Sequence, residues 1–179
     1  IDGTYFVDLS RVALDALSER GGLCARATTP LPFPDGTFEL VCLFEVLEHL
    51  EDDAGFLKEI QRVMRPGGAL FFSCPMNPAY WTYYDKVMGH ERRYRGEELT
   101  TRLEAAGFEV ERICARHDRM DRWFGAVFGF GTKYLGRFTS RIVSRYLPKV
   151  AALPWEWRDT TDFTEAEQRG GVTVRARKR

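Results

Sequence analysis

The residues Phe38–Phe44 form an almost continuous apolar run. Such a run predicts a strand buried on both faces, as in a parallel sheet covered by helices. Asp53 is placed to cap a helix over residues 53–64, and residues 66–68, Pro-Gly-Gly, end it before a second apolar run at 69–74. A strand, a helix and a strand in this order indicate a right-handed crossover within one sheet.

Strand-like and helical segments alternate along most of the chain. Further segments with these patterns are a strand at 5–7, a helix begun by Ser10, and then a strand at 23–27, a helix at 96–106 and a strand at 108–113. Apolar and polar residues alternate at 172–177, which predicts a half-buried strand at a sheet edge. This order predicts an α/β fold with a doubly wound, mostly parallel sheet. Residues 116–170 exceed an ordinary loop, and we expect them to form a helical insertion or lid before the last strand.

Composition restricts the partners and the compartment. Lys plus Arg number 26 and Asp plus Glu number 26, so no net field attracts nucleic acid, and none is expected as a partner. The four cysteines are widely spaced without a CxxC pair, which favours reduced core thiols in a cytoplasmic protein. No run of about 18 apolar residues and no signal-peptide pattern is present, so neither a membrane span nor a signal peptide is predicted.

Asp8 follows the first predicted strand. In open α/β sheets, ligands bind outside the carboxyl ends of the strands. An acidic side chain there can accept two hydrogen bonds from a ribose diol. The alternative, of equal weight, is that Asp8 only helps to begin the following helix.

Glu45, Glu48 and His49 come directly after the buried run. If this stretch is helical, the three side chains share one face. They could then hold a hard divalent cation such as Mg²⁺ or Mn²⁺, or supply a general base, and His90 or His117 could complete the set. The alternative is a solvated charged turn in which His49 packs against the sheet.

Two further segments could contact a substrate or a surface. Residues 75–94 are rich in tyrosine and tryptophan, which could form a pocket wall or only a packed lid. Residues 133–149 carry Arg137, Arg141, Arg145 and Lys149 at helical spacing. This pattern predicts a basic amphipathic helix, either in peripheral contact with an anionic membrane or with its charges simply facing solvent.

Five motifs, at residues 5–10, 31–41, 45–49, 62–68 and 105–108, together resemble the class I S-adenosylmethionine-dependent methyltransferases. The likeness extends from residue 5 to about residue 113. It implies a Rossmann-like, seven-stranded sheet with a reversed final strand, and S-adenosylmethionine lying across the strand ends.

The resemblance also assigns residues, position by position. It places Asp8 at the cofactor ribose, Ala27 and Thr28 at the adenine and Phe44 beside the cofactor, and it includes Leu9 among the cofactor-binding residues. Many relatives have an acidic residue where Ala27 stands, so this sequence offers no side-chain carboxylate there for the adenine amino group. Glu45, Glu48, His49 and His90 resemble the divalent-metal ligands of small-RNA 2′-O-methyltransferases and a similar motif of ubiquinone-pathway O-methyltransferases.

The family's glycine-rich loop follows its first strand and would precede Ile1. We therefore expect residues 1–115 and 171–179 to be an N-terminally truncated core without that strand and loop. The predicted function is methyl transfer, by O-methylation, to a small-molecule or lipid-linked acceptor. One alternative is a catalytically inactive, methyltransferase-like interaction module. Another, a nucleotide-dependent dehydrogenase, does not explain the order of the motifs.

Overall fold

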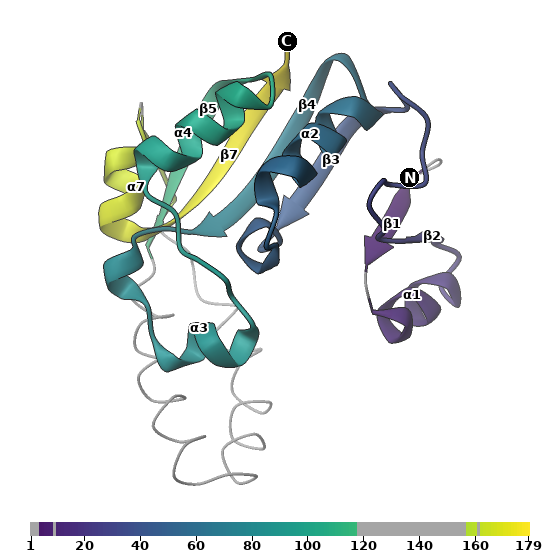
Figure 1. Ribbon diagram of the computed structural model, residues 1–179, viewed down its shortest axis with the longest axis horizontal. Coiled ribbons are helices and arrows are strands. Elements are labelled where there is room, and N and C mark those ends of the chain that lie inside the picture. The colour runs from purple at the N-terminus through teal and green to yellow at the C-terminus, as the bar shows by residue number, and fades with distance from the viewer. Residues whose placement is uncertain (1–3, 9, 118–156, 161) are drawn as a thin grey trace, which may run out of the picture.

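The computed structural model describes residues 4–8, 10–117, 157–160 and 162–179, and its strands form two sheets (Figure 1). The smaller sheet pairs β1 (Tyr5–Asp8) with β2 (Leu23–Arg26) in parallel. The larger sheet has five strands in the spatial order β3 (Phe38–Phe44), β4 (Met64–Pro75), β7 (Gly170–Lys178), β5 (Phe108–His117) and β6 (Trp157–Thr160). The predicted α/β class is confirmed.

Helices follow the strands as the alternation predicts. The first, α1 (Arg11–Ser18), begins at Ser10, whose hydroxyl accepts a hydrogen bond from the backbone N–H of Ala13 at 3.3 Å. The others are α2 (Asp53–Val63), α3 (Tyr83–Met88), α4 (Gly96–Ala105) and α7 (Phe163–Arg169), with short 3-10 turns η1 (Leu47–His49) and η2 (Pro78–Tyr80).

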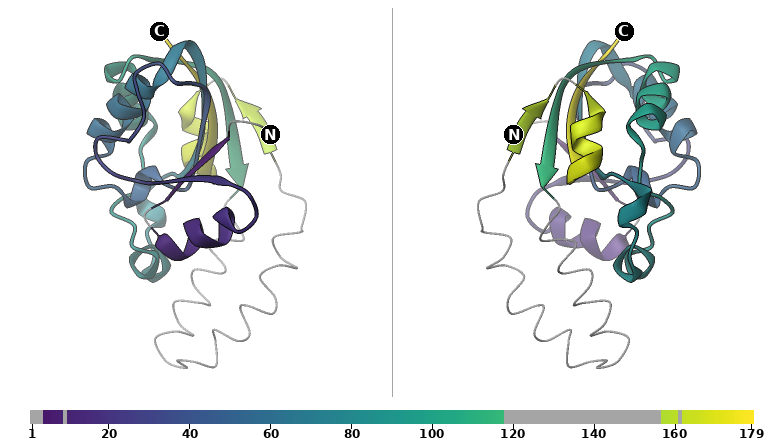
Figure 2. Two further views of the ribbon diagram at one scale, coloured as in Figure 1. Left: turned by 90° about the vertical axis from the view of Figure 1, so that its right-hand side faces the viewer. Right: turned by 90° about the vertical axis from the view of Figure 1, so that its left-hand side faces the viewer.

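The hydrophobic core lies between the larger sheet and the helices α2 and α4, which cover one of its faces (Figure 2). Leu57 on α2 and Leu99 and Leu103 on α4 are fully buried. Phe72 on β4 and Val174 on β7 are fully buried as well. Because this burial removes large apolar side chains from water, it is the main source of stability for this part of the chain.

The last strand is central, although its alternating pattern predicted a sheet edge. β7 runs antiparallel to both β4 and β5 and lies between them. Val172, Val174 and Ala176 are fully buried, so the alternation itself is confirmed. The edge prediction is wrong because a strand with one polar face can lie centrally wherever only one face of the sheet is covered. The reversed direction agrees with the family's reversed final strand.

The prediction for Phe38–Phe44 is right about the strand and wrong about its burial. β3 pairs with β4 on one side, and Leu40 and Phe44 are 53% and 62% exposed. In the part of the chain that the structure describes, no strand is hydrogen-bonded to the other side of β3. The smaller sheet instead contacts the start of β3 through side chains, since the ring of Tyr5 lies edge-on to that of Phe38 at 6.0 Å.

The cap of α2 is Asp52, which corrects the assignment to Asp53. Asp52 accepts a hydrogen bond from the N–H of Gly55 at 2.8 Å. Asp53 points inward, where it accepts hydrogen bonds from the Tyr94 hydroxyl at 2.7 Å and from Arg102 Nε at 2.9 Å. Two successive aspartates fit the capping position equally well, and only packing distinguishes them.

The region 116–170 contributes to the larger sheet where it is described. β6 pairs antiparallel with β5, and α7 packs against β5, β7 and α4. The predicted basic helix at 133–149 lies outside the described residues, as does Leu9.

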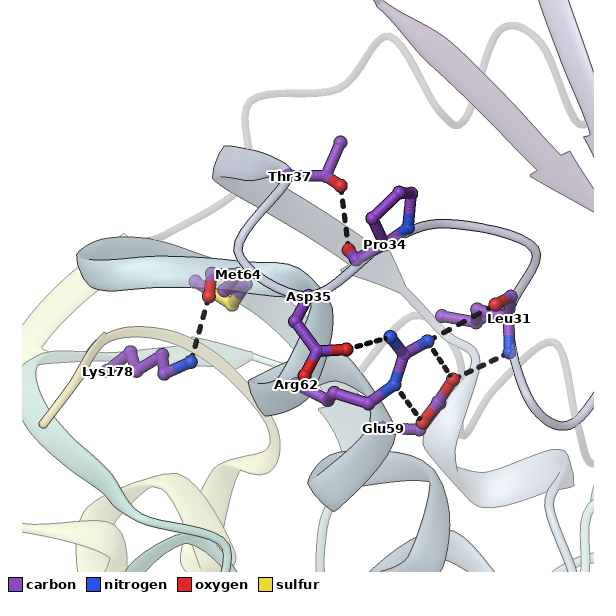
Figure 3. A network of polar contacts seen from close by, with 8 residues as sticks. All are labelled: Leu31, Pro34, Asp35, Thr37, Glu59, Arg62, Met64 and Lys178. Carbon is purple, nitrogen blue, oxygen red and sulfur yellow. Dashed lines mark hydrogen bonds and ion pairs between the residues drawn. The ribbon is translucent and has the colours of Figure 1, made fainter.

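Two of the sequence motifs meet in one polar network, shown in Figure 3. The guanidinium of Arg62 donates to both carboxylate oxygens of Glu59, to Asp35 Oδ1 at 2.5 Å and to the carbonyl oxygen of Leu31 at 3.2 Å. Glu59 in turn accepts from the N–H of Leu31 at 2.7 Å. We call Leu31, Asp35, Glu59 and Arg62 the Arg62 clamp. It ties the proline-rich loop before β3 to the end of α2.

The cysteines are free thiols, but they are not all in the core. Cys74 is buried, whereas Cys42 on β3 is exposed, which corrects the prediction of four core thiols. Among the described residues, no helix has the length and apolar character needed to cross a membrane.

Candidate functional site

The chain turns sharply where β3 ends. Glu45 has a positive φ of 53°, a conformation that non-glycine residues seldom adopt. Its carboxylate accepts a hydrogen bond from the buried Ser73 hydroxyl at 2.7 Å, and its N–H donates to the Ser73 carbonyl oxygen at 3.1 Å. The helical arrangement that would place Glu45, Glu48 and His49 on one face is therefore not formed. Helical backbone begins only at Leu47, in η1.

The structure brings together three of the four predicted catalytic residues. Glu48, His49 and His90 each offer a ligand atom, and these atoms lie within 4.8 Å of one another. The imidazole rings of His49 and His90 pack edge to face, with centroids 4.7 Å apart. Glu48 is fully buried, while the His49 side chain is 34% exposed. We call these three residues the histidine cluster.

Two hydrogen bonds hold the halves of the histidine cluster together, although these halves lie far apart in the sequence. His49 Nδ1 lies 3.1 Å from the carbonyl oxygen of Gly89, and the N–H of Glu91 donates to the carbonyl oxygen of Glu48 at 2.7 Å. Gly89 ends α3 in the left-handed conformation, with φ 76°. This turn lets His90 leave the helix toward η1.

Asp85, a residue that the sequence analysis missed, contacts His90 through a hydrogen bond to Nδ1. Asp85 on α3 is fully buried, and its Oδ1 lies 2.9 Å from His90 Nδ1 and 2.7 Å from Arg93 Nε. Burial would raise the pKa of Asp85, but the hydrogen bonds from His90 and Arg93 outweigh it and hold this pKa well below its usual range. Thr82 three residues earlier was the available signal, because this spacing is that of a capping box, which α3 indeed has.

The hydrogen bonds indicate which ring nitrogens remain for chemistry. A carbonyl oxygen and an ionised carboxylate can only accept, so Nδ1 of His49 and Nδ1 of His90 must donate. Nε2 of each neutral imidazole is then the nitrogen that can accept a proton or bind a cation. The histidine cluster, which includes the Glu48 carboxylate, can act as a general base or as a set of cation ligands.

The residues predicted to hold the cofactor lie at the carboxyl ends of β1, β2 and β3. Asp8 is exposed, and one carboxylate oxygen accepts from the Ser10 N–H at 2.7 Å. The Asp8 carbonyl oxygen accepts from the Ala27 N–H at 2.9 Å, so the two predicted positions are neighbours. Thr28 donates its hydroxyl hydrogen to the Pro30 carbonyl oxygen at 2.8 Å. Phe44 is largely exposed.

These residues are of the types that could hold a nucleoside cofactor. A carboxylate has roughly four acceptor positions, so Asp8 retains capacity for ribose hydroxyls beside its bond to Ser10. The exposed ring of Phe44 offers an apolar surface of the kind that an adenine or a ribose packs against. The arrowheads of β1, β3 and β4 point to the same side of the molecule, beyond which α3 lies (Figure 1).

Apolar side chains are exposed on α3 and just before it, close in sequence to His90. The exposed fractions are 42% for Trp81, 48% for Tyr83, 49% for Val87 and 47% for Met88. Tyr94, by contrast, is fully buried and donates to Asp53. The aromatic segment is thus divided between packing and an exposed apolar surface.

Comparison with known proteins places the matched sequence in one family. Residues 3–72 match the family described as "Methyltransferase domain". Over 83 residues the chain is 43% identical to a probable S-adenosylmethionine-dependent methyltransferase of Mycolicibacterium smegmatis, a match that covers 45% of this chain and 32% of that protein. Over 96 residues it is 31% identical to a demethylmenaquinone methyltransferase of Mycolicibacterium vanbaalenii, covering 52% of this chain and 42% of that protein. The matches thus span less than half the length of either relative.

The fold has a counterpart among solved structures. A S-adenosylmethionine-dependent methyltransferase from Thermotoga maritima matches with a TM-score of 0.67, over 98% of this chain and 73% of that one, at 17% identity. Identity this low shows the shared fold alone. The fold is the Rossmann-like one that the motifs predicted.

Proposed function

We propose that this chain, whose residues 3–72 match a methyltransferase domain, is a class I S-adenosylmethionine-dependent methyltransferase that methylates a hydroxyl group of a small, lipid-like acceptor. The observation that carries the proposal is the histidine cluster, which is assembled at the carboxyl end of β3 from two distant segments. In an open α/β sheet this end is where ligands bind.

The residues that would hold the cofactor are those at the ends of β1, β2 and β3. Asp8 would accept hydrogen bonds from the ribose hydroxyls, Ala27 and Thr28 would lie near the adenine and Phe44 would pack against the cofactor. Leu9 is proposed as a further cofactor-binding residue. When bound, S-adenosylmethionine supplies an electrophilic methyl group on a sulfonium.

The chain's own contribution is to align the acceptor and to accept its proton. A hydroxyl is a poor nucleophile until it loses its proton, and a base within hydrogen-bond reach lowers that barrier. Nε2 of His49 or of His90 would accept the proton, and the buried carboxylate of Glu48 would stabilise the resulting imidazolium. Glu45 is assigned an indirect role, because its carboxylate is engaged with Ser73.

The acceptor class follows from the exposed apolar surface on and before α3. The exposed apolar side chains of Trp81, Tyr83, Val87 and Met88 favour contact with a hydrocarbon or a ring over a highly charged molecule. The relative from M. vanbaalenii is named for methylation of demethylmenaquinone, a lipid-like quinone. Both points support a small hydrophobic acceptor.

A divalent cation is a second role for the same cluster. Two imidazole nitrogens and one buried carboxylate fit a divalent ion, and this donor set suits Mn²⁺ better than Mg²⁺, which prefers oxygen ligands. A bound cation would help the acceptor hydroxyl to lose its proton. Calorimetric titration of Mn²⁺ and Mg²⁺ into the chain, and into the variant His90→Ala, tests this role. Equal heats for the two proteins would exclude the cluster as the cation site.

Titration of S-adenosylhomocysteine into the full chain tests the proposed function. We expect binding that Asp8→Asn weakens by about tenfold or more, because a charge-assisted hydrogen bond to ribose is lost. Asp15→Asn is the matched control, since Asp15 is an exposed acid on α1 that pairs with Arg11. If the folded chain does not bind the ligand, the alternative, a catalytically inactive interaction module, becomes the better account.

A further inference from the structure

Asp85 accepts hydrogen bonds on both carboxylate oxygens, and the two oxygens serve different partners. Oδ2 accepts from the N–H of Thr82 at 2.7 Å and from its hydroxyl at 3.0 Å, which caps α3. Oδ1 faces Arg93 Nε at 2.7 Å and His90 Nδ1 at 2.9 Å. Capping the helix requires only Oδ2, and balancing the charge requires only Arg93. The contact with His90 therefore adds something that neither of these roles needs.

That contact determines where the imidazole proton lies. An ionised carboxylate has no hydrogen to donate, so the ring nitrogen facing it must carry the proton. The ring has little room to turn over, since the His90 side chain is 9% exposed and packs against His49. With Nδ1 protonated, a neutral imidazole has its lone pair on Nε2.

We propose that Asp85 is a positioning residue, which keeps the proton of His90 on Nδ1 and so leaves Nε2 as the reactive nitrogen of the histidine cluster. The proposal rests on the function proposed above, because it explains how His90 is prepared for that reaction. His49 is held in the same tautomer by a different acceptor, the carbonyl oxygen of Gly89. The two histidines therefore donate their Nδ1 protons to different acceptors.

The tautomer can be read directly by nitrogen NMR of the histidine rings. The full chain, labelled with ¹⁵N and free of cofactor, is measured at about pH 8, where ordinary imidazoles are neutral. We expect His90 to show a protonated Nδ1 and an unprotonated Nε2. A protonated Nε2 with a bare Nδ1 would overturn the proposal without any variant.

A pair of variants isolates the part played by Asp85. Removing Asp85 alone would also take a charged hydrogen-bond partner from the buried Arg93, so both proteins carry Arg93→Met and only one also carries Asp85→Ala. We expect His90 to keep the Nδ1–H tautomer in Arg93→Met and to populate the Nε2–H tautomer in the double variant. His49 should be unchanged in both, which makes it an internal control.

The same His90 tautomer in both variants would contradict the proposal. If the double variant does not give a dispersed amide spectrum, Asp85→Asn replaces Asp85→Ala in the Arg93→Met background. The amide is a weaker acceptor than a carboxylate, so a fraction of Nε2–H is still expected, and its absence would again overturn the proposal. The result does not depend on S-adenosylhomocysteine binding, which is titrated separately on the same samples. A failure of the proposed function is thereby distinguished from a failure of this assignment.

Discussion

The Arg62 clamp and the histidine cluster are both networks of polar side chains next to β3; the clamp includes the loop that leads into the strand, and the cluster includes the turn that follows it. In the Arg62 clamp, the guanidinium donates to Glu59, Asp35 and Leu31, all within the chain. In the histidine cluster, each imidazole makes its hydrogen bond through Nδ1, which leaves Nε2 for a ligand. A network that satisfies its own groups stabilises the fold, whereas one that reserves a donor or acceptor can do chemistry.

The largest difference between the two regions should appear in turnover. His49→Gln removes an imidazole from the histidine cluster, and we expect methyl transfer by the full chain to fall by about 10²- to 10⁴-fold. The free energy of unfolding should change by about 1 kcal/mol or less, because His49 is partly exposed and makes one hydrogen bond. Rates with the acceptor found by screening, together with urea unfolding, measure both effects.

The Arg62 clamp should behave in the opposite way. Glu59→Gln removes the charge that pairs with Arg62, and we expect the free energy of unfolding to fall by about 1 kcal/mol. Turnover per folded molecule should stay unchanged. The matched control is Glu39→Gln, whose ion pair with Arg65 is more exposed and should contribute less. A loss of turnover in Glu59→Gln at full folding would contradict the division between the two regions.

Substitutions at two glycines with similar positive φ test whether the turn at Gly89 positions the histidine cluster. Gly67 lies near the start of β4 and Gly89 follows α3, with φ of 73° and 76°, and a Cβ added at either would meet no atom within 4 Å. Gly67→Ala and Gly89→Ala should therefore each lower the free energy of unfolding by about 1 kcal/mol, through conformational strain alone. Only Gly89→Ala should shift the ring signals of His49 and His90. Identical histidine spectra in the two variants would show that this turn does not position the cluster.

The smallest expected effect is a pH dependence of stability. The hydrogen bond from Arg62 lowers the pKa of Glu59 below its ordinary value of 4.5. A carboxyl with a lowered pKa in the folded state stabilises the fold above its ordinary pKa, and this contribution is lost as the pH falls through the lowered value. Below pH 4.5, wild-type stability should thus decline more steeply than that of Glu59→Gln, as urea unfolding at several pH values can measure. Parallel curves would count against an ionised Glu59 in the clamp.

Local patterns predicted the elements well because they depend on nearest neighbours. The range Phe38–Phe44 coincides with β3, and Ser10 caps α1 as predicted. The burial of β3 and the position of β7 were predicted wrongly, since both depend on which strands lie alongside. Nor does the sequence distinguish Asp52 from Asp53 as the cap of α2, because that choice depends on contacts with Tyr94 and Arg102.

In the candidate site, too, the sequence predicted the residue types but not all of their contacts. Residue types and spacing pointed to Glu48, His49 and His90, but also to Glu45, whose positive φ turns it toward Ser73. Asp85 was missed because a buried acid in a short helix has no distinctive pattern beyond its capping box.

The sequence by itself determined the order of strands and helices, the family motifs and the residue types available for chemistry, because these follow from side-chain periodicity and local caps. Only the tertiary structure decided which of those residues meet and which nitrogen each histidine exposes. His49 and His90 are 41 residues apart, and their hydrogen-bond partners, the Gly89 carbonyl and Asp85, become neighbours only after α3 folds back toward η1. A contact of this kind depends on packing between distant segments, which no local pattern records.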